Sequence, residues 1–366
     1  MDQIRPPSSL TYIKPALESQ VYADSRRVSR FLAAQADPHA VLAAELGPAY
    51  AEYRRLWELA RTFKEIPPFP LHVDYEMKFS CPLSCPMCLM SLDEAGRRAF
   101  GDPDLELSAQ TVLDLVAEGA AQGQRALGFG GLWEPLLSPD LPEIAAFARA
   151  RGLVDVMFNT NGLWLTEKTA RALIKAGLTR LMVSLDADSQ ATYDRMRPGS
   201  DFSAVVANIE NFLDLRKKMG RRLPLLRLSF CRTSLNESEL EPFLARWSGR
   251  ADFISVQAYG RYPTPAAPAW PQAAWAPGPE GVCAQPFKRL LVRHNGQVCP
   301  CCDASGAGLA LGRLADLSLS EIWRGPELAE LRRSLLAGDL SGRASACSPC
   351  QAKFSPEPTA GGIRPC

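Results

Sequence analysis

The sequence has almost no net charge, few aromatic side chains and no long apolar run, and each shortage excludes a class of protein. Lys and Arg together number 41 against 40 acidic residues, and aromatic residues make up 8% of the chain. A nucleic-acid groove needs clustered basic and aromatic side chains, which this composition does not supply. A membrane-spanning helix needs a run of about 18 apolar residues, and none is present. We therefore expect no nucleic-acid partner and no membrane association.

A secretory signal is also missing, because Met1-Asp-Gln-Ile-Arg5 lacks the basic start and the apolar stretch that such a signal needs. This predicts a cytoplasmic protein. Cysteine, by contrast, is abundant, with 11 in the chain. Disulfides are rare in the cytoplasm, so these thiols need another explanation. They cluster at 81–88, 283–302 and 347–366, and Cys231 alone stands apart. Such clustering indicates metal binding.

The densest cluster is Cys81-Pro-Leu-Ser-Cys85-Pro-Met-Cys88, directly after the alternating segment Leu71–Phe79. Thiolates are soft ligands that suit zinc and iron–sulfur clusters. Three thiols from one loop can hold three corners of a 4Fe–4S cube and leave the fourth iron open. A structural zinc ion would need four ligands. The run by itself leaves both possibilities open.

The order of predicted elements indicates an α/β domain between residues 69 and 260. Strands and helices alternate, which favours parallel strands with helices outside. The predicted strands are His72–Phe79, Arg125–Phe129, Val154–Phe158, Arg180–Asp186, Leu225–Cys231 and Phe253–Tyr259. The predicted helices are Thr111–Ala121, Leu141–Arg151, Glu167–Ala176, Ser203–Lys218 and Glu239–Trp247. Six strands in this length suit an open partial (β/α)6, TIM-like barrel, whose chemistry lies at the C-terminal strand ends.

Two further segments flank this domain. Residues 1–68 are polar, and they predict an N-terminal helical extension with helices over 24–34 and 48–63. Residues 261–366 begin with a proline-rich stretch at 262–282. They continue with a hairpin at Leu290–Val298, turning at Asn295-Gly296, and end with a helix over Leu319–Leu336.

Polar motifs follow the successive strands of the predicted barrel. These are Gly130-Gly131-Leu-Trp133-Glu134-Pro135, then Asn159-Thr-Asn161-Gly162, then Ser184-Leu-Asp186, and then Tyr193-Asp-Arg195-Met-Arg197. Together with the Cys-x3-Cys-x2-Cys loop, these motifs resemble the radical S-adenosylmethionine (SAM) enzymes over residues 71–260. Two positions depart from the family pattern: Trp133 stands where a glycine often precedes the Glu, and Met87 replaces an aromatic residue.

The resemblance implies a 4Fe–4S cluster on Cys81, Cys85 and Cys88, with SAM chelating the open iron. One electron then splits SAM and yields a 5′-deoxyadenosyl radical. Backbone carbonyls near Gly130–Glu134 would hold the SAM amino group, and Arg195 or Arg197 would pair its carboxylate. The full set of expected SAM-binding residues is Gly130, Gly131, Trp133, Glu134, Asn159, Asn161, Ser184, Asp186, Arg195 and Arg197.

The segment from 261 to 366 resembles the auxiliary-cluster domain of the same superfamily, called SPASM or, in its shorter form, twitch. The resemblance implies a second, closed 4Fe–4S cluster on Cys283, Cys301, Cys347 and Cys350. A four-cysteine zinc knuckle is the alternative. The spare thiols are Cys299, Cys302 and Cys366, and an exchange among Cys299, Cys301 and Cys302 stays open.

Side-chain alternation suggests catalytic candidates inside the barrel. Arg227, Ser229 and Cys231 share one face of their strand, opposite an apolar face. The Cys231 thiol could return a hydrogen atom to a substrate radical, or it could be a plain core cysteine. Glu76 and Lys78 share a face in the same way. They could bind a polar substrate or act as acid and base, or they could belong to a salt-bridge network.

These features together predict a radical SAM enzyme that dehydrogenates or epimerises a sugar-like or aminocyclitol intermediate of natural-product biosynthesis. Dehydrogenation fits because short twitch enzymes that oxidise a carbinol pass the electron to such an auxiliary cluster. We expect a flavodoxin- or ferredoxin-type reductant as partner. The main alternative is modification of a ribosomally made peptide, which is disfavoured because residues 1–68 lack the strand-rich pattern of a leader-binding module. A zinc-stabilised binding protein is a third possibility.

Overall fold

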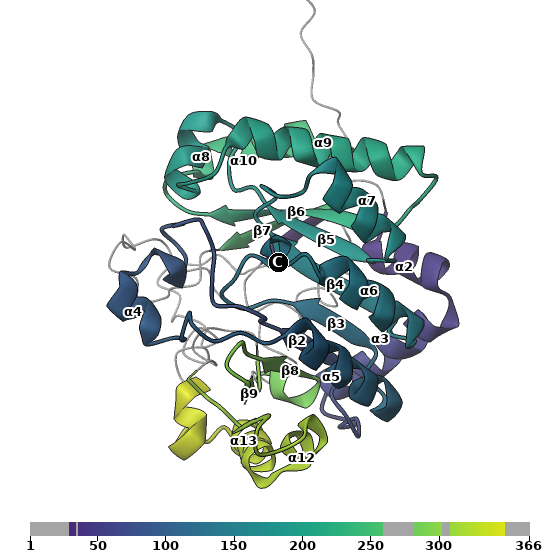
Figure 1. Ribbon diagram of the computed structural model, residues 1–366, viewed down its shortest axis with the longest axis vertical. Coiled ribbons are helices and arrows are strands. Elements are labelled where there is room, and N and C mark those ends of the chain that lie inside the picture. Colours follow the sequence, from purple (N-terminus) through teal and green to yellow (C-terminus); the bar gives the residue numbers. More distant parts are fainter. Residues whose placement is uncertain (1–28, 34–35, 259–281, 302–307, 348–366) are drawn as a thin grey trace, which may run out of the picture.

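The computed structural model describes residues 29–33, 36–258, 282–301 and 308–347. One ten-stranded sheet, in the order β1-β7-β6-β5-β4-β3-β2-β8-β9-β10, runs through these residues (Figure 1). Its strands are β1 (Ser29–Ala33), β2 (His72–Tyr75), β3 (Ala126–Phe129), β4 (Asp155–Thr160), β5 (Arg180–Ser184), β6 (Leu225–Arg232), β7 (Phe253–Ala258), β8 (Arg289–Val292), β9 (Gln297–Cys299) and β10 (Gly312–Arg313).

Strands β2 to β7 pair in parallel with their neighbours in chain order. The connecting helices lie outside the sheet (Figure 1) and are α5 (Ala109–Gln122), α6 (Leu141–Ala150), α7 (Glu167–Lys175), α9 (Phe202–Lys218) and α10 (Leu240–Trp247). Strands β2 and β7 do not pair with each other but take β8 and β1 as outer partners. The predicted partial (β/α)6 barrel is therefore confirmed as an open sheet.

Local capping explains where these helices begin. The Ser108 side chain accepts a hydrogen bond from the Thr111 backbone N–H at the start of α5, and Thr166 does the same for Thr169 at the start of α7. Each cap satisfies one of the backbone N–H groups that have no partner in the first helical turn. Gly123 caps the C-terminal end of α5 with a φ of 106°, which L residues rarely adopt.

The N-terminal extension is only partly helical. Helices α2 (Pro38–Leu46) and α3 (Pro48–Arg61) are present, but the predicted helix over 24–34 is wrong where the structure describes it. Residues 29–33 form β1, which pairs antiparallel with β7. A sheet edge has unpaired backbone groups, and β1 satisfies those of β7. Rings of α3 pack with residues at the starts of the barrel strands, so this extension covers the end opposite to the cysteine loop.

The second domain shares the barrel sheet. Strand β8 pairs in parallel with β2, and β8, β9 and β10 continue the sheet in antiparallel order. The predicted hairpin is present, and Gly296 in its turn has a φ of 77°. The predicted last helix is in fact two, α12 (Leu319–Arg324) and α13 (Pro326–Ala337), separated at Gly325. Pro326 has no N–H to donate, so it can start a helix but cannot continue the preceding one.

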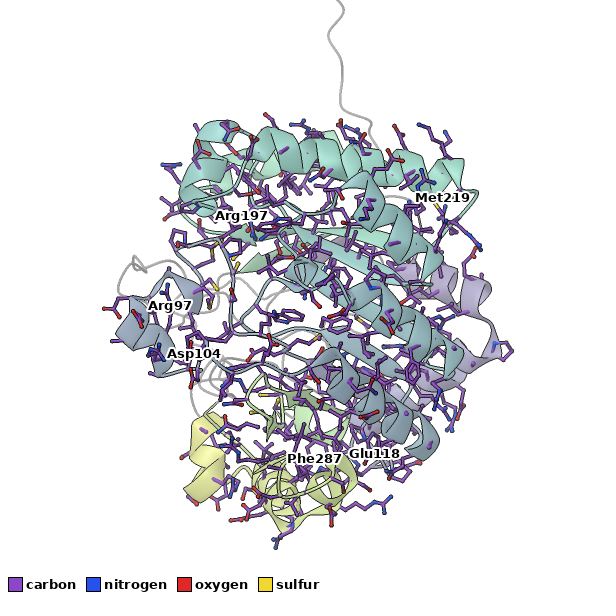
Figure 2. All side chains as sticks on the ribbon, in the orientation of Figure 1. Arg97, Asp104, Glu118, Arg197, Met219 and Phe287 are labelled. Carbon is purple, nitrogen blue, oxygen red and sulfur yellow. The ribbon has the colours of Figure 1, made fainter. Side chains whose placement is uncertain are left out.

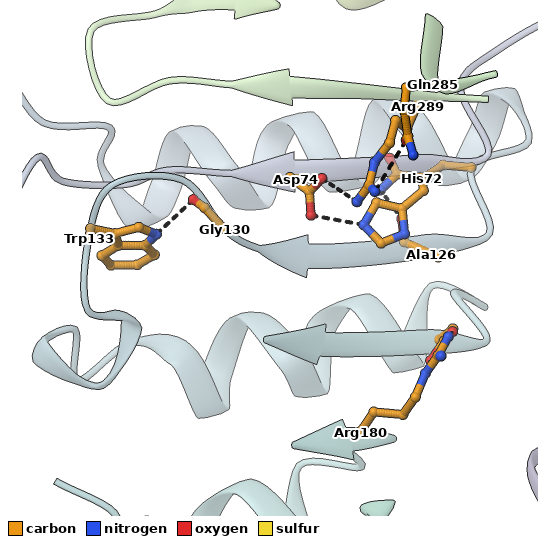
Figure 3. A network of polar contacts seen from close by, with 10 residues as sticks. His72, Asp74, Ala126, Gly130, Trp133, Arg180, Gln285 and Arg289 are labelled. Carbon is orange, nitrogen blue, oxygen red and sulfur yellow. Dashed lines mark hydrogen bonds and ion pairs between the residues drawn. The ribbon is translucent and has the colours of Figure 1, made fainter. Parts of the chain in front are cut away.

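A buried charge network joins the two domains between β2 and β8. The Asp74 carboxylate lies between the His72 ring, at 3.0 Å, and the Arg289 guanidinium, at 2.5 Å (Figure 3). Burial would raise the pKa of Asp74, yet Arg289 holds that pKa at about 2. This part of the strand therefore carries a buried salt-bridge network.

We expect Arg289→Met to lower the free energy of unfolding by about 3–5 kcal/mol, because Asp74 would stay buried without its cation. Anaerobic urea unfolding measures this difference. The double variant Asp74→Asn/Arg289→Met should lose less, since it removes the uncompensated charge as well. An Arg289→Met protein as stable as the parent chain would contradict the role of this pair.

Within the described ranges, the structure has no helix that combines the length and the apolar character needed to cross a membrane.

Candidate functional site

The cysteine loop follows β2 at the C-terminal edge of the barrel, and its neighbours hold its backbone. The Glu134 N–H donates to the Ser80 carbonyl at 2.9 Å, and the Ser84 N–H donates to the Pro198 carbonyl at 3.3 Å. The Cys85 side chain is buried, whereas Cys81 and Cys88 are half-buried. The loop is thus fixed between the residues that follow β3 and those that follow β5, as the strand-end rule predicts.

Burial raises the pKa of two of these thiols. It raises the pKa of Cys81 to about 11 and that of Cys85 to about 12. Without a metal both are neutral, so ligation must release protons. Among the described residues, no three His, Cys, Asp or Glu side chains converge as a single metal ion requires. A cubane places each thiolate on a different iron and does not need such convergence.

Arg197, which is labelled in Figure 2, is a cation that lies beside this loop. It directly follows helix α8 (Gln190–Met196), which the sequence did not predict. Its Nη1 lies 3.9 Å from the Cys85 Sγ, and its Nη2 donates to the Asp186 Oδ2 at 2.5 Å. Its Nε is buried and has no hydrogen-bond partner among the described residues. Soft thiols beside a buried guanidinium fit a negatively charged iron–sulfur cluster and an anionic ligand.

The structure separates the two candidate arginines. Arg195 is exposed, and its Nη2 donates to the Leu235 carbonyl at 2.8 Å. Arg197 is only 9% exposed and faces the cysteine loop. Of the two guanidiniums, therefore, Arg197 is the one that contacts a thiol of the cysteine loop among the described residues.

Asp186 makes hydrogen bonds through its carboxylate to more than one neighbouring element. Besides pairing with Arg197, it accepts the Cys231 backbone N–H on Oδ1 at 2.6 Å, and its carbonyl accepts the Asn236 Nδ2 at 2.8 Å. Its φ of 60° is unusual for a residue with a side chain. The Asp186 carboxylate holds Arg197 and the Cys231 backbone in place. Its expected contact with SAM stays a prediction. Asn236 was missed, because no local pattern marks it.

The Gly130–Glu134 loop is tied together by its own side chains. The Trp133 indole N–H donates to the Gly130 carbonyl at 3.0 Å (Figure 3), so this carbonyl already has one donor. The Glu134 carboxylate is buried, which raises its pKa. It accepts the Thr160 hydroxyl at 2.6 Å and the Asn161 N–H at 2.8 Å. Glu134 therefore joins the ends of β3 and β4. Its expected contact with SAM stays a prediction. Thr160, its partner, was also missed.

The other strand-end residues differ in how they are engaged. Asn161 caps its own turn through Oδ1, at 2.9 Å from the Leu163 N–H, while its buried Nδ2 has no hydrogen-bond partner in the described part of the chain. The Asn159 Oδ1 accepts from the Arg227 Nη2 at 2.9 Å. Ser184 ends β5 and is half-buried. The Asn161 Nδ2 thus has a free hydrogen-bond donor within the described part of the chain.

Glu76 and Lys78 do not lie together as alternation suggested, because β2 ends at Tyr75. Glu76 is 1% exposed, and its oxygens accept from Leu132, Arg293 and His294. The Lys78 side chain is 43% exposed and pairs with Glu106 at 3.0 Å. Both side chains therefore take part in ion pairs, which was one of the two possibilities, and a catalytic role for either stays a prediction.

Cys231 lies on β6 and is 8% exposed. It packs against Met87 of the cysteine loop and against Leu235. Its backbone N–H is held by Asp186, the residue that also pairs with Arg197. The predicted inner-face thiol is therefore next to the cluster loop.

The expected auxiliary ligands are only partly described. Cys283 and Cys347 are half-buried, and Cys299 and Cys301 are buried at the end of the β8–β9 hairpin. Burial raises the pKa of Cys299 to about 12. Cys302, Cys350 and Cys366 lie outside the described residues, as do residues 262–281 of the proline-rich stretch. The choice among Cys299, Cys301 and Cys302 stays a prediction.

The chain matches the radical SAM superfamily over residues 75–227 and the SPASM iron–sulfur cluster-binding domain over residues 283–351. Among solved structures, it is similar to Streptococcus suis SuiB bound to the precursor peptide SuiA, with 14% identity over 78% of this chain and 70% of that chain, and a TM-score of 0.58. Native anSMEcpe with bound AdoMet gives 16% identity over 71% and 82% of the two chains, and a TM-score of 0.52. BtrN in complex with AdoMet and 2-DOIA gives 15% over 74% and 88%, with a TM-score of 0.45.

At these identities the solved structures support the fold. The family matches agree with the site, in which three thiols of one loop and a buried guanidinium lie at the C-terminal edge of a partial barrel. This chain belongs to the radical SAM superfamily and carries a SPASM domain after its barrel, and its cofactors are SAM and 4Fe–4S clusters.

Proposed function

We propose that this enzyme removes a hydrogen atom from a C–H bond of a sugar-like or aminocyclitol metabolite and so epimerises or dehydrogenates it. When bound, SAM and its cluster supply a 5′-deoxyadenosyl radical, given one electron from a flavodoxin- or ferredoxin-type reductant. The single observation that carries the proposal is the position of Cys231, buried against Met87 within the cluster loop.

Different residues around the cysteine loop would hold the cluster and the groups of SAM. Cys81, Cys85 and Cys88 would hold the cluster, and Arg197 would pair the SAM carboxylate through the Nε that has no partner in the described chain. Asn161, through its buried Nδ2, and Ser184, through its hydroxyl, would donate to the remaining polar groups of SAM. The backbone carbonyls beyond Gly130 would receive the amino group, since the indole of Trp133 occupies that of Gly130.

Epimerisation would use the Cys231 thiol. A substrate carbon that has lost one hydrogen atom would take another from the thiol on the opposite face, which leaves a sulfur radical. One electron and one proton from outside would restore the thiol. Asp186 supports this role because it fixes the Cys231 backbone 2.6 Å from its Oδ1, on the same carboxylate that holds Arg197.

Dehydrogenation is the second candidate, and the contact between the two domains favours it. Here the substrate radical would lose a proton and pass one electron to a closed auxiliary cluster, which we assign to Cys283, Cys301, Cys347 and Cys350. The hairpin that carries Cys301 pairs with β2, the strand that leads into the cysteine loop. One auxiliary cluster is the count that these four thiols support.

Cys231→Ala separates the two outcomes. In an epimerase it should abolish product while 5′-deoxyadenosine still forms, and in deuterated water the parent enzyme should place one solvent deuterium in the product. A panel of aminocyclitols, with short peptides as the competing class, would be assayed by mass spectrometry. Unaltered turnover by Cys231→Ala would remove the thiol from the mechanism and leave dehydrogenation. Turnover of peptides alone would contradict the metabolite class.

A further inference from the structure

Glu76 links the loop that follows β3 to the hairpin of the SPASM domain. Its Oε2 accepts the Leu132 backbone N–H at 2.7 Å. Its Oε1 lies 3.1 Å from the Arg293 Nε and 2.7 Å from the His294 Nδ1. One carboxylate, 1% exposed, therefore contacts two elements that are far apart in the sequence.

On the loop side the fit is close. Gly131 has a φ of 102°, and a Cβ at this position would lie 2.2 Å from the Glu76 Oε2. Only glycine combines this backbone conformation with such an approach. The Gly130–Glu134 loop thus rests directly on the carboxylate, so a shift of Glu76 must move the loop.

On the hairpin side the contacts are equally buried. Arg293 and His294 are 2% and 1% exposed, and they form the turn between β8 and β9. The His294 ring stacks on Phe79, with centroids 5.3 Å apart. Cys299 and Cys301 follow a few residues later. A shift of the hairpin would separate the buried Glu76 carboxylate from both of its hairpin partners, which is costly.

We propose that Glu76 is a positioning residue that couples SAM binding to the ordering of the β8–β9 hairpin. Binding of SAM against the Gly130–Glu134 loop fixes Glu76, which in turn holds Arg293 and His294. Because coupling between two sites is reciprocal, an ordered hairpin also strengthens SAM binding.

Hydrogen exchange of the reconstituted holoenzyme, with and without SAM, tests this coupling. In the parent protein we expect SAM to slow exchange about tenfold both in residues 130–134 and in residues 293–299. In Glu76→Gln the amide still accepts the Leu132 N–H but loses its charge toward Arg293 and His294. Its hairpin should therefore no longer respond, while the loop still does.

Asp74→Asn is the matched control. Asp74 is also a buried β2 carboxylate paired with an arginine of β8, but among the described residues it accepts no hydrogen bond from the Gly130–Glu134 loop. This variant should keep the hairpin response. Arg293→Gln breaks the link from the other side and should lose it, which covers the case of a Glu76→Gln protein that does not fold. Two results would overturn the proposal. One is that SAM does not slow hydrogen exchange of residues 293–299 in the parent protein, and the other is that SAM slows it in Glu76→Gln as much as in the parent.

Discussion

Cys85→Ala is expected to abolish SAM cleavage. Cys85 is the most buried of the three loop thiols, and its Sγ lies 3.9 Å from the Arg197 Nη1. Without it the cluster would lose one of three corners, and the site of SAM would be lost with it. Anaerobically reconstituted protein should fall from about eight to about four irons per chain, since the auxiliary cluster has its own thiolates. Iron analysis and 5′-deoxyadenosine assays measure both effects.

Two other cysteine variants serve as controls for this result. Cys301→Ala should lose the auxiliary iron instead and retain SAM cleavage. Cys231→Ala should keep all of the iron, because its thiol is not a ligand in this assignment. A Cys85→Ala protein that still cleaves SAM would show that the Cys-x3-Cys-x2-Cys loop is not the cluster site. Equal iron loss in all three variants would point to misfolding.

Arg197→Gln is expected to weaken SAM binding about 30- to 150-fold. This is the effect of losing a charged hydrogen bond of about 2–3 kcal/mol. The change also leaves Asp186 buried without its cation. Arg197→Lys keeps the charge but loses the planar fork, so its affinity should lie between those of Arg197→Gln and the parent protein. Equilibrium dialysis of SAM against the reconstituted protein gives the dissociation constants.

Arg195→Gln is the matched control, two residues away in the chain. Arg195 is exposed and donates to a backbone carbonyl, so its loss should change SAM affinity by no more than about twofold. The double variant Asp186→Asn/Arg197→Gln tests whether the loss of SAM affinity comes only from the buried Asp186 carboxylate left without its cation. The amide introduced by Asp186→Asn could still accept the Cys231 N–H, so that contact would be kept. Equal effects at Arg195 and Arg197 would contradict the assignment.

Much of the barrel was predictable because its signals are local. Ser108 and Thr166 cap helices whose starts the sequence predicted, and the six parallel strands follow their apolar segments. The metal-binding role of the cysteine loop was equally predictable from the sequence. Three thiols within eight residues can reach one cluster in any fold that keeps the loop intact.

The tertiary structure decided what depends on distant partners. Arg195 and Arg197 are equivalent in sequence, but Arg197 lies at the end of α8, where the chain leaves the helix and turns toward Cys85. Residues 29–33 are a strand because β7 offers an unpaired edge, a need that their own composition does not reveal.

Glu76 shows the same division most clearly. Its place in an alternating segment suggested a shared face with Lys78, but alternation holds only while the strand continues, and β2 ends at Tyr75. Its partners Arg293 and His294 lie 217 and 218 residues further along the chain. Spacing and capping act within a few residues, so the sequence alone determined the elements and the cysteine loop. Burial and charge pairing act between elements, so only the folded chain decided which polar residues lie beside the cysteine loop and which pair with one another to join its elements.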